Sequence, residues 1–427
     1  MQNFQFFILL LDNLWLYFFS LIICTIPIFI IAKKYTRSWI DPLRIGLLFV
    51  AFANTVPLFL FLINEIPIYL FCYFILSETL FWIGFVWLAK KEIKFSSKKI
   101  INEIRISNLL YFIFFVLYVS FTTFSYLKFG IPIFAESRLA TFFDSGGFGV
   151  LARLNSFFIL YILMYSYFIL DKKKSLFYRL FSILVFITIA TTGILSGSRS
   201  GFLMFIYAYF GYQYFFKKTL PKIKKVLKYA PIILSGAIIV LLITTQGSIN
   251  NAFIALGSRV IASGDVYWMA FPNEIFKNLN VGNNFTYLFS GFLGPLRIID
   301  YSSVSPPIGA QLTWTLIPSL QGIMVGPNGR APVLGYVMFG WGGLIFSFIL
   351  GIFTSVLIFR TAKIFPEGFI SSVFVFYIYM NAQHFIGDSP LGITYLFDIL
   401  LNLFFVFFAI VVLGVLIKKV DRNHCIK

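Results

Sequence analysis

The chain has 427 residues, of which 59% are hydrophobic, 20% aromatic and only 12% charged, and its mean hydropathy is +0.90. A soluble domain of this size cannot bury so much apolar surface, so lipid must be the solvent for much of the chain. The formal net charge of +18 would suggest nucleic acid in a soluble protein. Here the positive charge lies in short loops between apolar runs, as the positive-inside rule requires, and no nucleic-acid partner is expected.

Eleven apolar stretches are candidates for transmembrane helices, because about 20 residues of helix are needed to cross the hydrocarbon core. They cover about 14–32, 45–63, 66–89, 107–127, 151–170, 178–196, 201–216, 229–245, 332–359, 369–386 and 392–417. The sequence therefore predicts an all-α polytopic membrane protein with about eleven helices (10–12). Residues 1–427 are expected to form a single integral membrane domain.

Basic residues alternate between rich and poor loops along the chain. Every second loop is rich in Lys and Arg. Together these loops hold 26 of the 34 Lys and Arg residues, whereas the intervening loops hold eight. The rich side is predicted to be cytoplasmic, which places the C-terminus there and, with eleven spans, the N-terminus outside. The cytoplasmic side has 20 Lys and 6 Arg, but the outer side has 2 Lys and 6 Arg. Orientation does not require these outer arginines, so they indicate a ligand, because arginine binds planar and phosphate oxyanions through a rigid fork of donors.

Two outer segments are too long to be simple connectors. Residues 128–150 carry Glu136 and Arg138 among aromatic side chains, which is typical of an interfacial segment that binds sugars, or of a plain amphipathic surface helix. Residues 246–331 are aromatic and rich in Gly and Pro. This large loop is expected to lie on the membrane surface or to dip between helices, and not to form a detached soluble domain.

The large outer loop contains three of the outer arginines, Arg259, Arg297 and Arg330, together with Asp265. Arg330 lies in a Gly-Pro-Asn-Gly-Arg-Ala-Pro sequence at the mouth of the ninth span, where Gly and Pro permit tight backbone against a ligand. There it can meet a lipid-linked diphosphate without crossing the hydrocarbon. The alternative is that these arginines snorkel to lipid headgroups. We expect Arg259 and Arg330 to bind the diphosphate.

Three further residues are weaker candidates. Arg199 stands at the tip of a Gly- and Ser-rich hairpin between two spans, where it either binds the ligand or anchors a packing turn. His384 and Asp388 lie near the outer end of the tenth span and are four residues apart. That spacing allows a shared helix face, but Gly387 and Pro390 disfavour a helix there, and the alternative is a capping or core role. The chain has only two histidines, so no metal site and no cofactor is expected. Arg153, at a span start, is expected to be an interface anchor.

The chain resembles the Wzy-type oligosaccharide repeat-unit polymerases, which build O-antigen or capsule. The resemblance rests on its Phe-rich polytopic sequence, its large late outer loop and three short motifs. These motifs are Gly-Ile-Pro-Ile followed by Arg138 and Gly-Gly, Leu-Ser-Gly-Ser-Arg199-Ser-Gly, and Gly-Pro-Asn-Gly-Arg330-Ala-Pro before a Gly-rich span. In this family the functional residues are arginines of the periplasmic loops, which matches Arg259, Arg297 and Arg330 by location.

The resemblance implies a GT-C-like glycosyltransferase of the bacterial inner membrane with its active site on the periplasmic side. It would transfer the growing glycan from undecaprenyl diphosphate to a sugar hydroxyl of the next lipid-linked repeat unit, without metal or nucleotide sugar. The expected partners are the undecaprenyl-diphosphate-linked oligosaccharide, membrane lipids and a chain-length regulator protein.

The proposed chemistry needs positive charge at the leaving diphosphate and a base for the acceptor hydroxyl. Arg297 and Arg199 are expected to assist Arg259 and Arg330. The base is expected to be Asp265, which is six residues from Arg259, or else His384. A single displacement would invert the anomeric centre.

Two other functions compete with polymerisation. O-antigen ligases share the expected architecture but use a histidine of the large outer loop, and residues 246–331 contain none. A flippase or other transporter of lipid-linked oligosaccharide should show repeated halves and charged residues within its spans. The sequence is interpreted as having its charges on one outer face instead, which favours the polymerase.

Overall fold

The computed structural model describes residues 1–90, 93–99, 103–134, 149–172, 175–197, 199–221, 238, 257–258 and 260–425, without the side chains of 199, 200, 301 and 418–425. The protein is an all-α polytopic membrane protein. Within these ranges nine helices are long and apolar enough to cross a membrane. They are Leu14–Tyr35, Pro42–Leu62, Ile68–Leu88, Glu103–Phe134, Gly149–Asp171, Leu176–Leu195, Ala331–Phe359, Phe369–Gly387 and Ser389–Ile417.

These nine helices coincide with nine of the eleven predicted spans. The predicted span 201–216 is helical but changes type along its length. It begins as a 3₁₀ turn (Arg199–Phe202), continues as α9 (Leu203–Gly211) and ends as a π-helical turn (Tyr212–Phe216). The predicted span 229–245 lies outside the described residues except for Ile238.

Packing contacts group the chain into two compact units. Unit 1 contains Met1–Ile93, Phe253–Thr361 and Tyr379–Leu396. Unit 2 contains Lys94–Ala252, Ala362–Ile378 and Phe397–Lys427.

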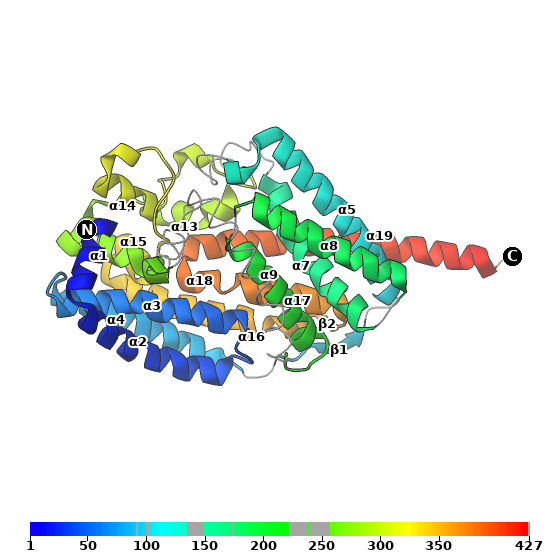
Figure 1. The fold of residues 1–427 in the computed structure, drawn as a ribbon, viewed down its shortest axis with the longest axis horizontal. Helices are drawn as coiled ribbons and strands as arrows, with labels where there is room; N and C mark the ends of the chain where they lie inside the picture. Colours follow the sequence, from blue (N-terminus) through cyan, green and yellow to red (C-terminus); the bar gives the residue numbers. More distant parts are fainter. Residues whose placement is uncertain are drawn as a thin grey trace. The chain divides into compact units, whose positions relative to one another are not determined.

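The frame of unit 1 is a set of long helices, of which α2 runs along α3 and α4 runs along α16 (Figure 1). Its helices are α1 (Asn3–Asp12), α2 (Leu14–Tyr35), α3 (Pro42–Leu62), α4 (Ile68–Leu88), α15 (Ala331–Phe339) and α16 (Gly343–Phe359). Glycines bring α4 and α16 together: a Cβ at Gly351 would lie 2.0 Å from the carbonyl oxygen of Phe81, and one at Gly84 would lie 2.3 Å from that of Phe348. Such close approach is how helices associate in lipid, where small residues let the backbones touch.

The described part of the large outer loop is folded into unit 1 as a series of short helices. They are the 3₁₀ turn Ala262–Gly264, α12 (Asp265–Ala270), Pro272–Asn278, α13 (Asn284–Leu293), Tyr301–Ser303, α14 (Ile308–Leu316) and Pro318–Leu320. Trp268 of α12 is fully buried and stacks on Phe6 of α1 at a ring distance of 4.0 Å. A Cβ at Gly264 would lie 2.8 Å from the carbonyl oxygen of Ala53 in α3. This segment therefore dips between the helices of unit 1.

Unit 2 is built on α5 (Glu103–Phe129), α7 (Gly149–Asp171), α8 (Leu176–Leu195) and α9, with parts of α17 (Phe369–Asn381) and α19 (Ser389–Cys425). Four basic loops meet at one of its ends. The strand β1 (Ser96–Lys99) pairs in parallel with β2 (Pro366–Glu367). Lys218 forms an ion pair with Glu367, and Lys217 forms one with Asp171 at 3.0 Å. The sequence assigns all four loops to the cytoplasmic side, and their contact agrees with a common side.

Candidate functional site

Arg330 is the residue immediately before α15, and its side chain is turned into unit 1. Only 7% of the residue is exposed. Its Nε donates a hydrogen bond to the carbonyl oxygen of Ser263 at 3.0 Å. Pro332 follows in the first turn of α15, where a missing N–H is harmless. The arginine is thus held by one bond from the large outer loop and by the start of a helix.

The Gly-rich sequence before Arg330 is required by close backbone contacts. A Cβ at Gly326 would lie 2.1 Å from the carbonyl oxygen of Gly309 in α14, so only glycine fits at this crossing. Gly329 donates its N–H to Oδ2 of Asp388 at 3.3 Å. The motif that the sequence analysis noted therefore positions Arg330 between α14 and the segment before α19.

The two terminal amino groups of Arg330 form no hydrogen bond or ion pair within the described part of the chain. Two carboxylates lie near enough to interact with its charge, those of Glu78 and Asp388. Arginine has five N–H donors, and only Nε–H is used here. The guanidinium is therefore held in place while most of its donors form no hydrogen bond in the described part of the chain.

Glu78 lies inside α4, ten residues after its first residue, which corresponds to roughly 15 Å along the helix axis. Its Oε2 accepts hydrogen bonds from Nδ2 of Asn54 at 2.9 Å and from Nε1 of Trp82 at 3.0 Å. Glu78 was not among the residues predicted for the site, and the prediction that the charges lie on one outer face is wrong. The signal was present, because an acidic residue within an apolar span is a functional candidate by default.

Several buried polar atoms around these charges have no hydrogen-bond partner among the residues that the structure describes. They are Oδ1 of Asn54, the hydroxyl of Tyr267 and Oγ of Ser263. Burial raises the pKa of Tyr267 well above its ordinary value, with a smaller contribution from Glu78, so its hydroxyl remains a donor. Unpartnered buried polar groups are rare in proteins and call for water or a ligand. We call Arg330, Glu78, Asp388, Asn54, Tyr267 and Ser263 the Arg330 cluster.

Asp388 joins α18 (His384–Gly387) to α19. Its Oδ1 accepts the N–H of Leu391 at 3.1 Å, and its Oδ2 accepts that of Gly329. Burial raises the pKa of the Asp388 carboxyl above its ordinary value, and these hydrogen bonds and the charge of Arg330 offset the rise only in part. A raised pKa makes the carboxylate a better proton acceptor near neutral pH.

His384 and Asp388 do not share a helix face, although their spacing of four residues allowed one. Helix α18 ends at Gly387, and Asp388 has extended backbone with φ −157° and ψ 108°. The imidazole of His384 stacks on the ring of Tyr395, with centroids 4.1 Å apart. Gly387 and Pro390 interrupt the helix here, so the spacing of four residues does not bring the two side chains together.

The other candidates in the large outer loop are placed differently. Asp265 opens α12, two residues after Ser263, and its Oδ1 accepts the N–H of Val266 at 3.0 Å. Arg297 is exposed in the turn after α13, with φ +56°. The structure thus brings Asp388 to Arg330, keeps Asp265 close along the chain, and leaves Arg297 on the surface.

Four predicted site residues cannot be placed in this way. Arg259, Arg138 and Glu136 lie outside the described residues, and so does the side chain of Arg199, whose backbone begins a 3₁₀ turn in unit 2. Their roles stay predictions. Among the described residues, no three His, Cys, Asp or Glu side chains are grouped to hold a metal ion.

A second intramembrane charge cluster lies in unit 2. Arg153 of α7 forms an ion pair with Asp398 of α19, and its guanidinium lies 5.4 Å from the ring centre of Phe397. Asn402 donates to the carbonyl oxygen of Arg153 at 3.3 Å. The side chains of Arg153 and Asp398 are 20% and 7% exposed. The expectation that Arg153 is an interface anchor is wrong, because it is paired inside the protein.

No family model matches the chain, and no curated protein or solved structure is similar enough to it to count as a match. The function must therefore be argued from the residues of the site.

Proposed function

We propose that this protein is a lipid-diphosphate-dependent glycosyltransferase that polymerises undecaprenyl-diphosphate-linked oligosaccharide repeat units of a bacterial surface polysaccharide. It would act in the inner membrane, with its active site on the periplasmic side and its C-terminus in the cytoplasm. The observation that carries the proposal is Arg330, a buried guanidinium that is fixed through Nε and keeps both terminal amino groups open. This arrangement suits bidentate binding of a phosphate.

The surroundings of Arg330 suit a leaving diphosphate. A buried charge acts more strongly on a ligand than a charge in water, because the effective dielectric constant is lower. In their ionised forms Glu78 and Asp388 offset part of the positive charge of the arginine. This balance holds the spent lipid diphosphate less tightly than an arginine without acidic neighbours would, which favours its release after each transfer.

The reaction is a single displacement. The oxygen of the acceptor hydroxyl attacks the anomeric carbon of the growing glycan, and the bond from that carbon to the diphosphate oxygen breaks. The electron pair leaves with undecaprenyl diphosphate, whose charge Arg330 offsets, and the hydroxyl proton passes to Asp388. We rank Asp388 above Asp265 and His384 as the base. Burial raises the pKa of Asp388, and its carboxyl interacts with the charge of Arg330. The anomeric centre inverts, and a product with the anomeric configuration of the donor would contradict this step.

The remaining arginines are auxiliaries in this proposal. Arg259, Arg297 and Arg199 would guide the diphosphates of donor and acceptor, and Arg138 with Glu136 would contact the sugars. The resemblance to Wzy-type polymerases supports a GT-C-like transfer without metal or nucleotide sugar, and a chain-length regulator protein as partner.

Transport is the second candidate function, and Glu78 is the observation that favours it. A carboxylate inside a span is typical of proton- and ion-coupled transporters. A flippase for the same lipid-linked oligosaccharide would also need a cation such as Arg330 along the path of the diphosphate. A ligase is less favoured, because His384 stacks on Tyr395 and lies outside the large outer loop.

The deciding experiment is reconstitution of the purified protein with a defined repeat-unit diphosphate lipid. Polymerisation yields a ladder of products with one new linkage, and a transporter yields only movement of the lipid between leaflets. Arg330→Lys and Arg330→Ala should both lose the ladder. Lys277→Gln is the matched control, since Lys277 is an exposed cation of the same outer loop, paired with Glu274. A full ladder of products from the Arg330→Ala variant would contradict the proposal that Arg330 binds the diphosphate.

A further inference from the structure

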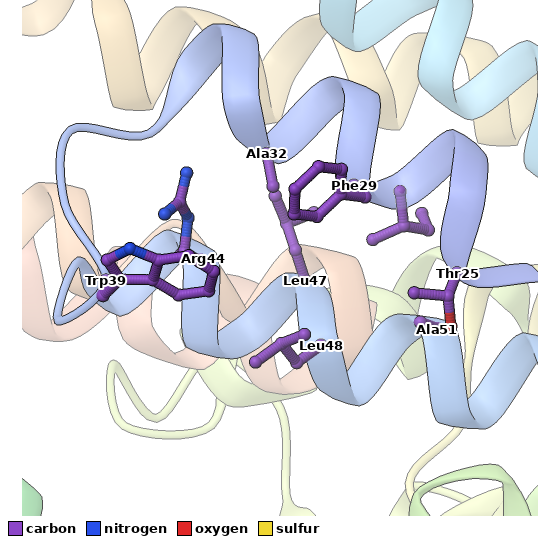
Figure 2. A pocket seen from close by; sticks show the side chains of 9 residues that line it. Thr25, Phe29, Ala32, Trp39, Arg44, Leu47, Leu48 and Ala51 are labelled. Atoms are coloured by element: carbon purple, nitrogen blue, oxygen red, sulfur yellow. The ribbon is translucent and has the colours of Figure 1, made fainter. Parts of the chain in front are cut away.

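A shallow apolar groove runs between α2 and α3 and ends at a cation (Figure 2). Phe29, Ala32, Leu47 and Leu48 lie along it, and Arg44 stands beside Trp39 at its end. It shares no residue with the Arg330 cluster. We propose that this groove binds one anionic phospholipid, with a phosphate oxygen on Arg44 and one acyl chain along the groove.

The guanidinium of Arg44 is held in place before any lipid binds. Its central carbon lies 4.6 Å from the centre of the Trp39 ring, and its Nε donates to Oγ1 of Thr36 at 2.9 Å. Within the described part of the chain Arg44 makes no further hydrogen bond, so its terminal amino groups have no competing partner there. A fixed arginine fork binds phosphate at a lower entropic cost than a mobile lysine does.

The charge around Arg44 selects an anion. Residues 33–44 contain two lysines and two arginines but only one acidic residue, Asp41. That carboxylate is fully buried and accepts hydrogen bonds from the N–H of Leu43 and the hydroxyl of Tyr379. Lys33 and Lys34 are exposed at the same helix end. No carboxylate of this segment therefore competes at the surface, and a headgroup with net negative charge is favoured over a zwitterionic one.

The length of the groove fits one leaflet. Beyond Phe29 it continues into a second hollow, lined by Leu21, Ile22, Thr25, Ile26, Phe29 and Ile30. From Leu21 to Ala32 the helix rises roughly 17 Å, and half of the hydrocarbon core is about 15 Å. If the phosphate of the lipid lies at Arg44, its acyl chain thus reaches about as far as the second hollow extends.

The test uses the purified full-length protein in nanodiscs of zwitterionic phosphatidylcholine, with phosphatidylglycerol added and bound lipid counted by native mass spectrometry. We expect one phosphatidylglycerol to be retained in preference to phosphatidylcholine. Arg44→Gln should weaken this binding about tenfold, because it removes a charge-assisted contact. Lys34→Gln, which removes an equal charge from the same surface, should weaken it less than threefold, as expected for a screened surface charge.

Three outcomes would overturn the proposal. Equal losses in Arg44→Gln and Lys34→Gln mean diffuse attraction to the surface, and equal retention of both lipids means that the headgroup is not recognised. Leu48→Trp fills the groove without altering charge, and it should also lower retention. Unchanged binding in that variant shows that the groove is empty, and it decides the question even if Arg44→Gln fails to fold.

Discussion

Arg153 and Arg330 are both arginines near the start of a helix and both are turned into the protein, but their surroundings differ. Arg153 has a direct counterion, because it forms an ion pair with Asp398, and an aromatic ring lies beside its guanidinium. Arg330 has two acidic neighbours but forms an ion pair with neither in the described part of the chain. A charge that is paired directly stabilises a fold, whereas a charge without a direct counterion is available to a ligand. The pair thus separates a structural arginine from a functional one.

The largest expected effect is on stability, in unit 2. Arg153→Ala leaves Asp398 unpaired inside the protein and should destabilise it by about 3–5 kcal/mol. The double variant Arg153→Met with Asp398→Leu should recover most of that loss, because neither charge then remains. Thermal unfolding in detergent measures both. If Arg153→Ala is as stable as the parent, the ion pair is not structural and the comparison fails.

A substitution in the Arg330 cluster should lower activity more than stability, unlike Arg153→Ala. Arg330→Ala should lower the polymerisation rate about 100- to 1,000-fold, as for loss of one preorganised donor at a developing charge, while unfolding shifts by less than in Arg153→Ala. The reconstituted reaction and the unfolding curve are measured on the same preparations. A large loss of stability with Arg330→Ala would make Arg330 a second structural arginine.

The raised pKa of Asp388 predicts a pH dependence. The carboxylate is the active form of a base, so kcat/KM should fall tenfold per pH unit below that pKa and level off above it. Because burial raises the pKa, the fall should begin at a higher pH than for an exposed aspartate. The Asp388→Asn variant should have a low kcat/KM that does not change with pH over the same range. An unchanged acid limb in Asp388→Asn assigns the titration to another group.

Glu78 should have the smallest effect on polymerisation. Glu78→Gln keeps an oxygen for Asn54 and Trp82 but cannot ionise, so no negative charge can form there near Arg330 and undecaprenyl diphosphate should bind about fivefold more tightly. Asp12→Asn removes an exposed carboxylate of the same unit and should leave binding unchanged. Competition by undecaprenyl diphosphate measures both variants. The transporter function would be favoured instead if the parent protein makes no polymer and the Glu78→Gln variant no longer moves the lipid between leaflets.

The nine long apolar helices of the described part coincide with predicted spans, because the ability to cross a membrane depends on the local sequence. Every backbone group in lipid must be satisfied within its own helix, so length and composition alone identify a span. The short helices between Ala262 and Leu320 had no such signal, since each is shorter than a span. Their burial depends on contacts with α1, α3 and α4 that are distant in sequence.

The sequence by itself determined the solvent, the spans and the alternation of charge, and it singled out Arg330 and Asp388 as candidates. Only the tertiary structure decided which charges meet. Glu78 and Arg330 are 252 positions apart, and Arg153 and Asp398 are 245 apart. Spacing along a chain predicts contacts within one helix, but whether an arginine has a direct counterion depends on which helices pack together. That choice distinguishes Arg330 from Arg153.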